Sequence, residues 1–243
     1  MAVYIEINNI QKNYGSKTIL NNINTKLNIS SPSIIGIIGN NGAGKSTFLK
    51  TISGILLPNS GKITVTNLTE KYLYEKWAKK NIAYIQSGER GLKLKNTAKD
   101  NIIYYGLLKG AFKKEVLSSI DKYSPLMGLE NLLERKCENL SMGEKKKVQI
   151  MCGICSGVGI IILDEPSNGL DITAVYELKK IIQYIKNKQG KIVIIASHEI
   201  QFLESIATKY IFMHDGRIDT LVETDLTFQD IDKIIEGKGI LKK

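Results

Sequence analysis

Residues 39–47 have the types and spacing that bind phosphate groups. They are Gly39, Asn40, Asn41, Gly42, Ala43, Gly44, Lys45, Ser46 and Thr47, and they fit the pattern G-x-x-x-x-G-K-[ST]. Glycines let the backbone wrap closely round a phosphate chain, and N–H groups at a helix start point toward it. Lys45 would supply charge to the outer phosphates, and Ser46 could hold magnesium. A glycine-rich turn is the alternative, but the pattern favours binding of a nucleoside triphosphate by this segment, the phosphate loop.

Such a loop works only between a buried strand and a helix. Residues 33–38 form an apolar run that is typical of a buried parallel strand. After the loop, apolar residues recur at helical spacing up to Leu56. Gly54 and the turn at 58–61 are expected to end the helix. The sequence therefore predicts a strand–loop–helix unit.

Two carboxylates and a histidine follow later strands of the same kind. Residues 160–163 are apolar, and Asp164 and Glu165 come directly after them. Open α/β sheets bind ligands at the carboxyl ends of such strands. Asp164 is therefore placed to hold magnesium, directly or through water, and Glu165 to polarise a water molecule, although a turn with a helix cap is the alternative. A further apolar run at 191–196 is followed by His198, which we expect at the same edge.

The first thirty residues alternate loosely between apolar and polar types. This pattern predicts short strands joined by polar turns, with one turn at 13–16. Tyr14 lies in that turn, shortly before the phosphate loop. Its ring could stack on a nucleotide base, or it could be an ordinary turn residue that covers a sheet edge, and the residues alone leave both open.

The composition of the chain changes after Gln86. Strands are expected at 62–66 and 81–86, with a basic helix at 69–80 between them, and Gln86 lies where the second strand ends. Residues 87–95 are basic and typical of an exposed loop.

A mostly helical insertion is predicted next, between two halves of an α/β domain. The helical pattern begins at Thr97, a plausible N-cap, and continues to about Glu138. Gly110 and the pair Ser124–Pro125 are expected to break it.

Ser141 and Glu144 have the spacing of a capping box, so a helix is expected to start there. Lys145, Lys146 and Lys147 would then place three cations in its first turn, against the helix dipole. A well-started helix is one explanation of this segment. An anion near the helix start, which would offset the opposing charges, is the other.

The remaining elements complete the α/β pattern. A helix is expected after Asp171, with Gly190 at its end. Residues 214–216 are typical of a hairpin turn, and the tail from Thr224 indicates a short helix with a lysine-rich end.

Composition limits the class of protein. The chain has 243 residues, 43% of them hydrophobic, which is ample for a core. Its longest nearly apolar stretch, 150–163, is shorter than the roughly 20 residues of a membrane span, and the N-terminus has no signal-peptide run. We therefore expect a soluble, cytosolic protein. Its net charge of +10 favours an anionic partner, which could be nucleic acid, anionic lipid or the nucleotide.

The three cysteines fit a reducing compartment. Cys152 and Cys155 have the C-x-x-C spacing of a metal or redox pair, but both lie in the apolar stretch 150–163. These two cysteines are better interpreted as small buried core residues.

Together these motifs resemble the ATP-binding subunit of ABC transporters, over about residues 3–222. They occur in the order of that family: the phosphate loop, the glutamine loop from Gln86, the signature Leu140–Glu144, the acidic motif Ile160–Pro166, the segment Ser167–Asp171, and the switch His198. Tyr14 lies where the family places the aromatic residue that stacks on adenine.

The resemblance implies a fold and its division. The fold would be α/β, a phosphate-loop NTPase core with a mostly parallel sheet, an N-terminal antiparallel β-subdomain and an inserted helical subdomain at about 87–158. Residues 1–222 would form the ATPase domain, and 223–243 a short helical tail.

The resemblance also implies residue roles in ATP hydrolysis. Glu165 would activate the attacking water, His198 would hold the γ-phosphate, and Lys45 would contact the outer phosphates. ATP with Mg²⁺ would be bound by Tyr14, the phosphate loop, Gln86, Ser141, Gly143 and Asp164. The magnesium ligands among these would be Ser46, Gln86 and Asp164.

The expected partners follow from the same resemblance. Two copies, or one copy and a paralogue, would face head to tail, with each nucleotide between one phosphate loop and the other subunit's Ser141 and Gly143. Transport would require a separate transmembrane permease, which would hold the protein in the cytoplasm at the inner face of the membrane. The segment Gln86–Arg90, followed by Leu92, is similar to the class that exports drugs, antibiotics, lipids or polysaccharides. No nucleic acid is expected as a partner.

One departure and two rival functions remain. The signature reads Leu-Ser-Met-Gly-Glu where the family usually has Leu-Ser-Gly-Gly-Gln, so Met142 and Glu144 could alter affinity across the dimer. A soluble ABC ATPase acting on ribosomes or DNA would suit the net charge, but those relatives usually have two such domains or long coiled-coil insertions. A phosphate-loop kinase or GTPase would leave the signature and His198 unexplained.

Overall fold

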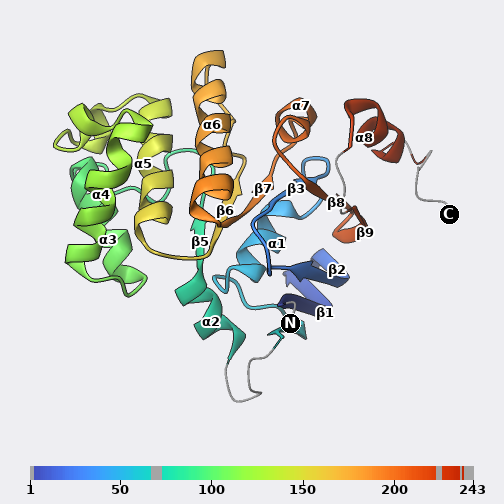
Figure 1. The fold of residues 1–243 in the computed structure, drawn as a ribbon. Coiled ribbons are helices and arrows are strands. Elements are labelled where there is room, and N and C mark those ends of the chain that lie inside the picture. Colours follow the sequence, from blue (N-terminus) through green and yellow to red (C-terminus); the bar gives the residue numbers. More distant parts are fainter. Residues whose placement is uncertain (1–2, 67–72, 223–225, 236, 238–243) are drawn as a thin grey trace.

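The computed structural model describes residues 3–66, 73–222, 226–235 and 237. Within these residues the strands form a six-stranded sheet, in the order β5-β6-β7-β3-β8-β9, and a three-stranded sheet, in the order β2-β1-β4 (Figure 1). The strands are β1 Tyr4–Tyr14, β2 Lys17–Asn28, β3 Ile34–Ile38, β4 Ser60–Val65, β5 Ile82–Ile85, β6 Ile160–Asp164, β7 Ile192–Ala196, β8 Lys209–His214 and β9 Arg217–Val222. The helices are α1 Lys45–Ile52, α2 Tyr74–Asn81, α3 Ala98–Leu108, α4 Lys113–Met127, α5 Met142–Cys155, α6 Ile172–Gln189, α7 Ile200–Glu204 and α8 Phe228–Ile235, with short 3₁₀ helices at Glu130–Leu132 and Cys137–Asn139.

The six-stranded sheet is the middle layer of the molecule. Its strands pair in parallel except β8 with β9, which are antiparallel. Every residue of β3, β6 and β7 is buried, because side chains on both faces of these strands enter a core. On one face Ile37 and Ile162 pack with α1 and the antiparallel sheet, and on the other face Leu163 and Ile195 pack with α5, α6 and α7. The predicted mostly parallel α/β fold, with an N-terminal antiparallel subdomain, is confirmed.

The first two strands are longer than the sequence pattern indicates. Asn13 and Tyr14 were expected in a turn, but both pair with β2, and only Gly15 and Ser16 connect the strands. Gly15 has φ +59°, which glycine adopts without strain. Shifts of register interrupt the pairing between Ile7 and Asn13. They break the alternation of apolar and polar residues, which is the pattern that predicts strand length.

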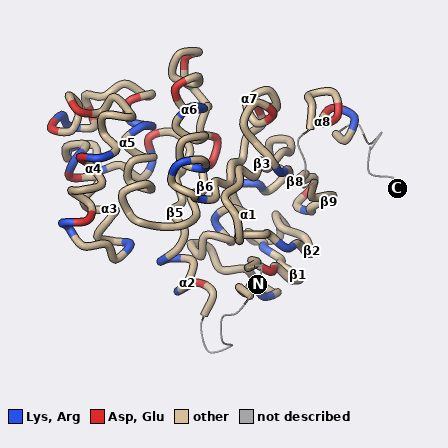
Figure 2. The backbone as a smooth tube through the Cα atoms, viewed as in Figure 1, with Lys and Arg blue, Asp and Glu red and all other residues tan. Residues whose placement is uncertain are grey.

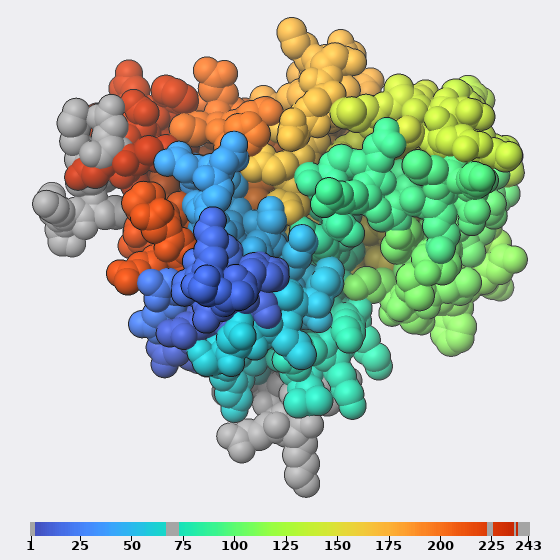
Figure 3. All heavy atoms as spheres, turned by 180° about the vertical axis from the view of Figure 1, so that it is seen from behind, coloured from blue at the N-terminus to red at the C-terminus, as the bar shows by residue number. Residues whose placement is uncertain are grey.

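The helical subdomain consists of α3, α4 and α5, which pack on one another beside the sheet (Figures 1 and 3). Thr97 caps α3 as predicted, since its hydroxyl accepts a 3.0 Å hydrogen bond from the Asp100 N–H. The break expected at Ser124–Pro125 is wrong, because α4 continues through Pro125 and ends at Gly128, with φ +61°. Proline removes one hydrogen bond there, in the last turn, while Met127 beyond it is buried in the core.

The other predicted helix ends and turns are confirmed. Gly190 ends α6 in the left-handed conformation, and Asp171 caps its start. Asp215 and Gly216 both have positive φ in the two-residue turn between β8 and β9, as a type I′ hairpin requires. The tail helix is α8. The lysine-rich end and the segment 69–72, expected at the start of a basic helix, lie outside the described residues. The helix that follows that segment, α2, begins at Tyr74.

Cys137, Cys152 and Cys155 are buried and unpaired with one another, and the expectation that Cys152 and Cys155 are core residues is confirmed. Burial raises the pKa of Cys155 to about 12. Among the described residues, none of the helices combines the length and apolar character needed to cross a bilayer.

Candidate active site

The phosphate loop connects β3 to α1 at the carboxyl edge of the central sheet, and its backbone requires glycine. Gly42 and Gly44 have φ +88° and +97°. A Cβ atom on Gly44 would lie 2.8 Å from the Ile19 carbonyl oxygen, which is closer than real Cβ contacts. The loop is also fixed from outside, because the Gly216 N–H donates to the Ala43 carbonyl at 3.2 Å. The β8–β9 turn therefore supports the loop.

The start of α1 is suited to an anion. Gly44 is its N-cap and has no side chain that could cap the helix, and no acidic residue occupies the first turn. The N–H groups of this turn precede the first helical carbonyl partners, so they are available to a ligand. A helix N-terminus with free N–H groups and no competing carboxylate favours phosphate.

Lys45 is 6% exposed and folds back over the loop. Its Nζ donates to the carbonyl oxygens of Gly39 at 2.6 Å and Asn40 at 3.3 Å. The same Nζ lies 3.6 Å from Glu165 Oε1. The buried ammonium is thus held at the centre of the loop, where it is paired with carbonyl dipoles and one carboxylate.

Ser46, Asp164 and Tyr84 come together at the end of β6. The Ser46 hydroxyl donates to Asp164 Oδ1 at 2.9 Å, and the Tyr84 hydroxyl donates to Oδ2 at 2.7 Å. Asp164 is 4% exposed. Hard oxygen ligands beside a phosphate site are the donors that magnesium prefers, and the residues present fit that ion.

Glu165 and His198 form the second half of this edge. His198 Nδ1 lies 2.8 Å from Glu165 Oε2, and the His198 backbone N–H donates to the same oxygen at 3.3 Å. Glu165 has φ +46°, an uncommon conformation for a residue other than glycine, and its N–H donates to the Ala196 carbonyl at 2.8 Å. Strain of this kind is concentrated at functional sites. The side chain of Glu165 consequently lies between Lys45 and His198.

The signature residues lie in a separate hollow of about 260 Å³ between α5 and the start of α6. Ser141 and Glu144 form the predicted capping box, with bonds of 3.2 Å to the Ser141 hydroxyl and 2.7 Å to the Glu144 carboxylate. Glu144 also lies 3.7 Å from Arg135. Gly143 has so little room that an added Cβ would be 3.2 Å from the Ala174 Cβ.

The three lysines of α5 have protein partners. Lys145 pairs with Glu89 at 2.7 Å and Lys147 with Glu177 at 2.7 Å, while Lys146 donates to the Gln86 carbonyl at 3.2 Å. The explanation that they mark a bound anion is therefore not needed, because these carboxylates and this carbonyl offset the opposing helix dipole. Burial lowers the pKa of Lys146 to about 8, an effect that the charge of Asp164 partly offsets.

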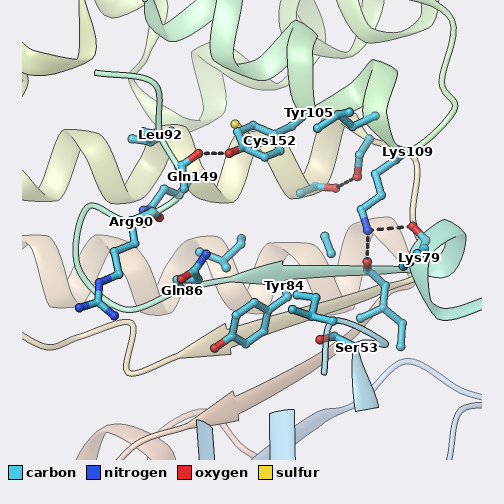
Figure 4. A pocket seen from close by; sticks show the side chains of 18 residues that line it. Ser53, Lys79, Tyr84, Gln86, Arg90, Leu92, Tyr105, Lys109, Gln149 and Cys152 are labelled. Carbon is cyan, nitrogen blue, oxygen red and sulfur yellow. Dashed lines mark hydrogen bonds between the residues drawn. The ribbon is translucent and has the colours of Figure 1, made fainter. Parts of the chain in front are cut away.

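The glutamine loop is attached to α5 rather than free. Gln149 Nε2 donates to the carbonyl oxygens of Gly88 at 3.0 Å and Arg90 at 2.9 Å. Beyond the loop, a cavity of about 400 Å³ lies between β5, α3 and α5, and the Gln86 side chain is among those that line it (Figure 4). Within the part of the chain that the structure describes, no hydrogen bond joins Gln86 to Ser46 or Asp164, whereas those two residues bond each other directly.

Tyr14 is the last residue of β1 and is exposed. Its ring is 52% exposed, and Lys12 Nζ lies 5.7 Å from its centroid. The stacking of Tyr14 on a nucleotide base stays a prediction.

Sequence reasoning missed Tyr84 and Arg135. Tyr84 is the one residue with a polar tip in the apolar run 82–85, and a buried tyrosine usually finds a hydrogen-bond partner, so a signal existed. Arg135 has no such signal, because its pairing with Glu144 depends on how the segment after α4 folds back.

The comparisons with known proteins agree with this arrangement. A family model described as ABC transporter matches residues 20–168. The lantibiotic transport ATP-binding protein SrtF of Streptococcus pyogenes is 32% identical over 98% of this chain and 99% of its own length.

Solved structures give the same result. The chain resembles cbiO1 from Clostridium perfringens, part of the ABC transporter complex cbiONQ, with a TM-score of 0.79 and 25% identity, over 98% of this chain and 95% of that one. It also resembles MJ0796, a bacterial ABC transporter cassette solved as a dimer, with a TM-score of 0.74 and 25% identity, over 92% of this chain and 100% of that one.

Proposed function

This chain belongs to the ABC transporter family, as one of its ATP-binding ATPase subunits, and on that premise we propose that it powers export through a separate membrane permease. The observation that carries the proposal is the set of Lys45, Ser46, Asp164, Glu165 and His198 at one sheet edge. These side chains come from three separate segments, and they meet within hydrogen-bond or ion-pair distance.

Each of these residues has a role in hydrolysis. The α1 N-terminus and Lys45 bind the phosphates, which are oriented for in-line attack. Glu165 accepts a proton from the attacking water, and His198, which touches Glu165, holds the γ-phosphate. Ser46 and Asp164 would hold magnesium, which supplies charge that stabilises the developing phosphate oxyanions. Gln86 would be the third magnesium ligand of this set.

ATP binding would bring two subunits together head to tail. Ser141 and Gly143 line a hollow whose wall includes no residue of the phosphate loop. A triphosphate held in one loop can therefore reach a signature only on a second subunit, which we expect to be another copy of this chain. The dimeric structure of MJ0796 supports this part of the proposal. Hydrolysis would remove the shared contact and open the dimer.

The loop from Gln86 to Lys95 is the proposed contact with the permease. Arg90, Lys93 and Lys95 are exposed, so their charges are available to a partner and to an anionic membrane face. The backbone below them is fixed, since the Asn101 amide bonds both the N–H and the carbonyl of Lys93, at 2.8 and 3.1 Å. A fixed loop attached to α5 would move with the signature helix when nucleotide binds.

The cargo class is a drug, antibiotic peptide, lipid or polysaccharide. Within that class, SrtF supports a peptide antibiotic, because its name is that of a lantibiotic transport protein and the match spans nearly all of both chains. The protein would act in the cytoplasm, at the inner face of the membrane that holds the permease.

The rival function is a soluble ATPase that acts on ribosomes or nucleic acid. The net charge of +10 favours it, but lysines and arginines are distributed over the helical subdomain, α2, the antiparallel sheet and other elements (Figure 2). Electrostatic recognition of a polyanion normally uses a clustered basic face.

A charge reversal of the loop tests the proposal. The double variant Arg90→Glu, Lys93→Glu should keep basal ATPase activity while losing membrane recruitment and transport. Lys186→Glu, Lys188→Glu is the matched control, because it makes the same change of charge at the far end of α6. ATPase rates are measured with the permease in lipid and with added RNA. Stimulation by RNA, with no response to any membrane partner, would overturn the transporter function.

A further inference from the structure

Tyr84 contacts the nucleotide site from the neighbouring strand. In the parallel pairing of β5 with β6, Tyr84 lies opposite Ile162, two residues before Asp164. Side chains two residues apart point to the same face of a sheet, so the ring of Tyr84 extends toward Asp164. The ring is also part of the wall of the cavity of about 400 Å³ (Figure 4). Only its hydroxyl reaches the carboxylate, at 2.7 Å.

The hydrogen bond has a fixed direction. The Tyr84 hydroxyl donates to Asp164 Oδ2 at 2.7 Å. An ionised carboxylate can only accept, and therefore Tyr84 donates. The two oxygens of Asp164 are thus assigned to different partners, Oδ1 to Ser46 and Oδ2 to Tyr84.

We propose that Tyr84 is a positioning residue that keeps Oδ1 of Asp164 turned toward Ser46, where the magnesium ion would be held. The inference rests on the proposed function, because it concerns the metal site of that reaction. Without the Tyr84 hydroxyl, the buried carboxylate loses one of its two hydrogen bonds and the restraint on its rotation. Groups that orient a metal ligand in this way typically contribute 10- to 100-fold to metal affinity.

The test is Tyr84→Phe, which keeps the ring and removes only the hydroxyl. The probe is Mn²⁺, titrated into the protein saturated with a non-hydrolysable ATP analogue and followed by the electron paramagnetic resonance signal of free Mn²⁺. We expect the Mn²⁺ affinity to fall about 10- to 100-fold. Affinity for the same analogue in EDTA should stay within about twofold, because no contact of the phosphate loop changes.

Tyr105→Phe is the matched control. Tyr105 lines the same cavity, and its hydroxyl donates to the Gly91 carbonyl rather than to a carboxylate. This variant should keep the Mn²⁺ affinity of the wild type. An equal loss in both variants, or a Tyr84→Phe variant that weakens the analogue in EDTA as much as it weakens Mn²⁺, would show a structural role and overturn the proposal. Unchanged Mn²⁺ affinity in Tyr84→Phe would also overturn it.

Asp164→Asn separates this inference from the proposed function. If Asp164→Asn loses Mn²⁺ while Tyr84→Phe does not, the metal site stands and the role of Tyr84 fails. If Asp164→Asn binds Mn²⁺ like the wild type, the proposed metal site itself is wrong, and the inference fails with it.

Discussion

Replacing Tyr14 by alanine removes a ring that adds little to the stability of the core. We predict that the same ring adds much to the affinity for nucleotide. The side chain is 52% exposed, so the free energy of unfolding should change by no more than about 0.5 kcal/mol. Stacking of a base on an aromatic ring contributes about 1–3 kcal/mol. Lys12 Nζ lies 5.7 Å from the centroid of the ring, and the exposed part of the residue is available to a base. Nucleotide affinity should therefore fall roughly 5- to 150-fold, measured by equilibrium titration with a fluorescent ATP analogue.

Two further variants decide what the loss means. Tyr14→Phe keeps the ring and should bind almost as the wild type does. Tyr104→Ala removes another exposed tyrosine with a lysine over its ring, Lys93 at 4.5 Å, and should leave affinity unchanged. If phenylalanine proves as damaging as alanine, the hydroxyl matters and the stacking argument is refuted. Loss of affinity together with a lower unfolding midpoint would also refute it.

Three other predictions concern the site and the core. Glu165→Gln should bind ATP normally, hydrolyse it about 10²–10⁴-fold more slowly and accumulate an ATP-dependent dimer, seen by size-exclusion chromatography; normal turnover would remove Glu165 from its role. Lys45→Ala should weaken nucleotide binding itself, and an unchanged titration would mean that the lysine points elsewhere in the complex. Cys155 has a pKa raised from 9.0 to about 12, so the folded state holds its proton more tightly than the unfolded state. Stability should therefore fall as pH rises from about 9 toward 12, and Cys155→Ala should reduce that fall in denaturant titrations; an identical pH profile would contradict it.

Much of the site could be predicted from sequence, because it is built at the ends of strands. The apolar runs before Gly39, Asp164 and His198 identify buried parallel strands, and parallel strands place their carboxyl ends at one edge. The N-caps of helices could be predicted equally well, as the Thr97 cap and the Ser141 capping box show. In each case a short-range pattern carries the information.

The missed features depend on distance along the chain. The partners of Lys145 and Lys147 are Glu89 and Glu177, which are far from them in sequence and reach them only through the fold. The sequence predicts a helix break at Pro125, because a proline always removes one hydrogen bond from a helix. The burial of Met127, which offsets that loss, cannot be predicted from the sequence alone. For Tyr84, the sequence indicates that a buried hydroxyl needs a hydrogen-bond partner, but it does not identify Asp164 as that partner.

The contacts of Lys45 with its own loop enter the free energy of nucleotide binding. The ammonium already has the Gly39 and Asn40 carbonyls as partners, so phosphate does not meet an unsatisfied charge. Binding is an exchange reaction, in which the lysine leaves two carbonyl acceptors and a carboxylate 3.6 Å away for phosphate oxygens, and the measured affinity is the difference between these two states.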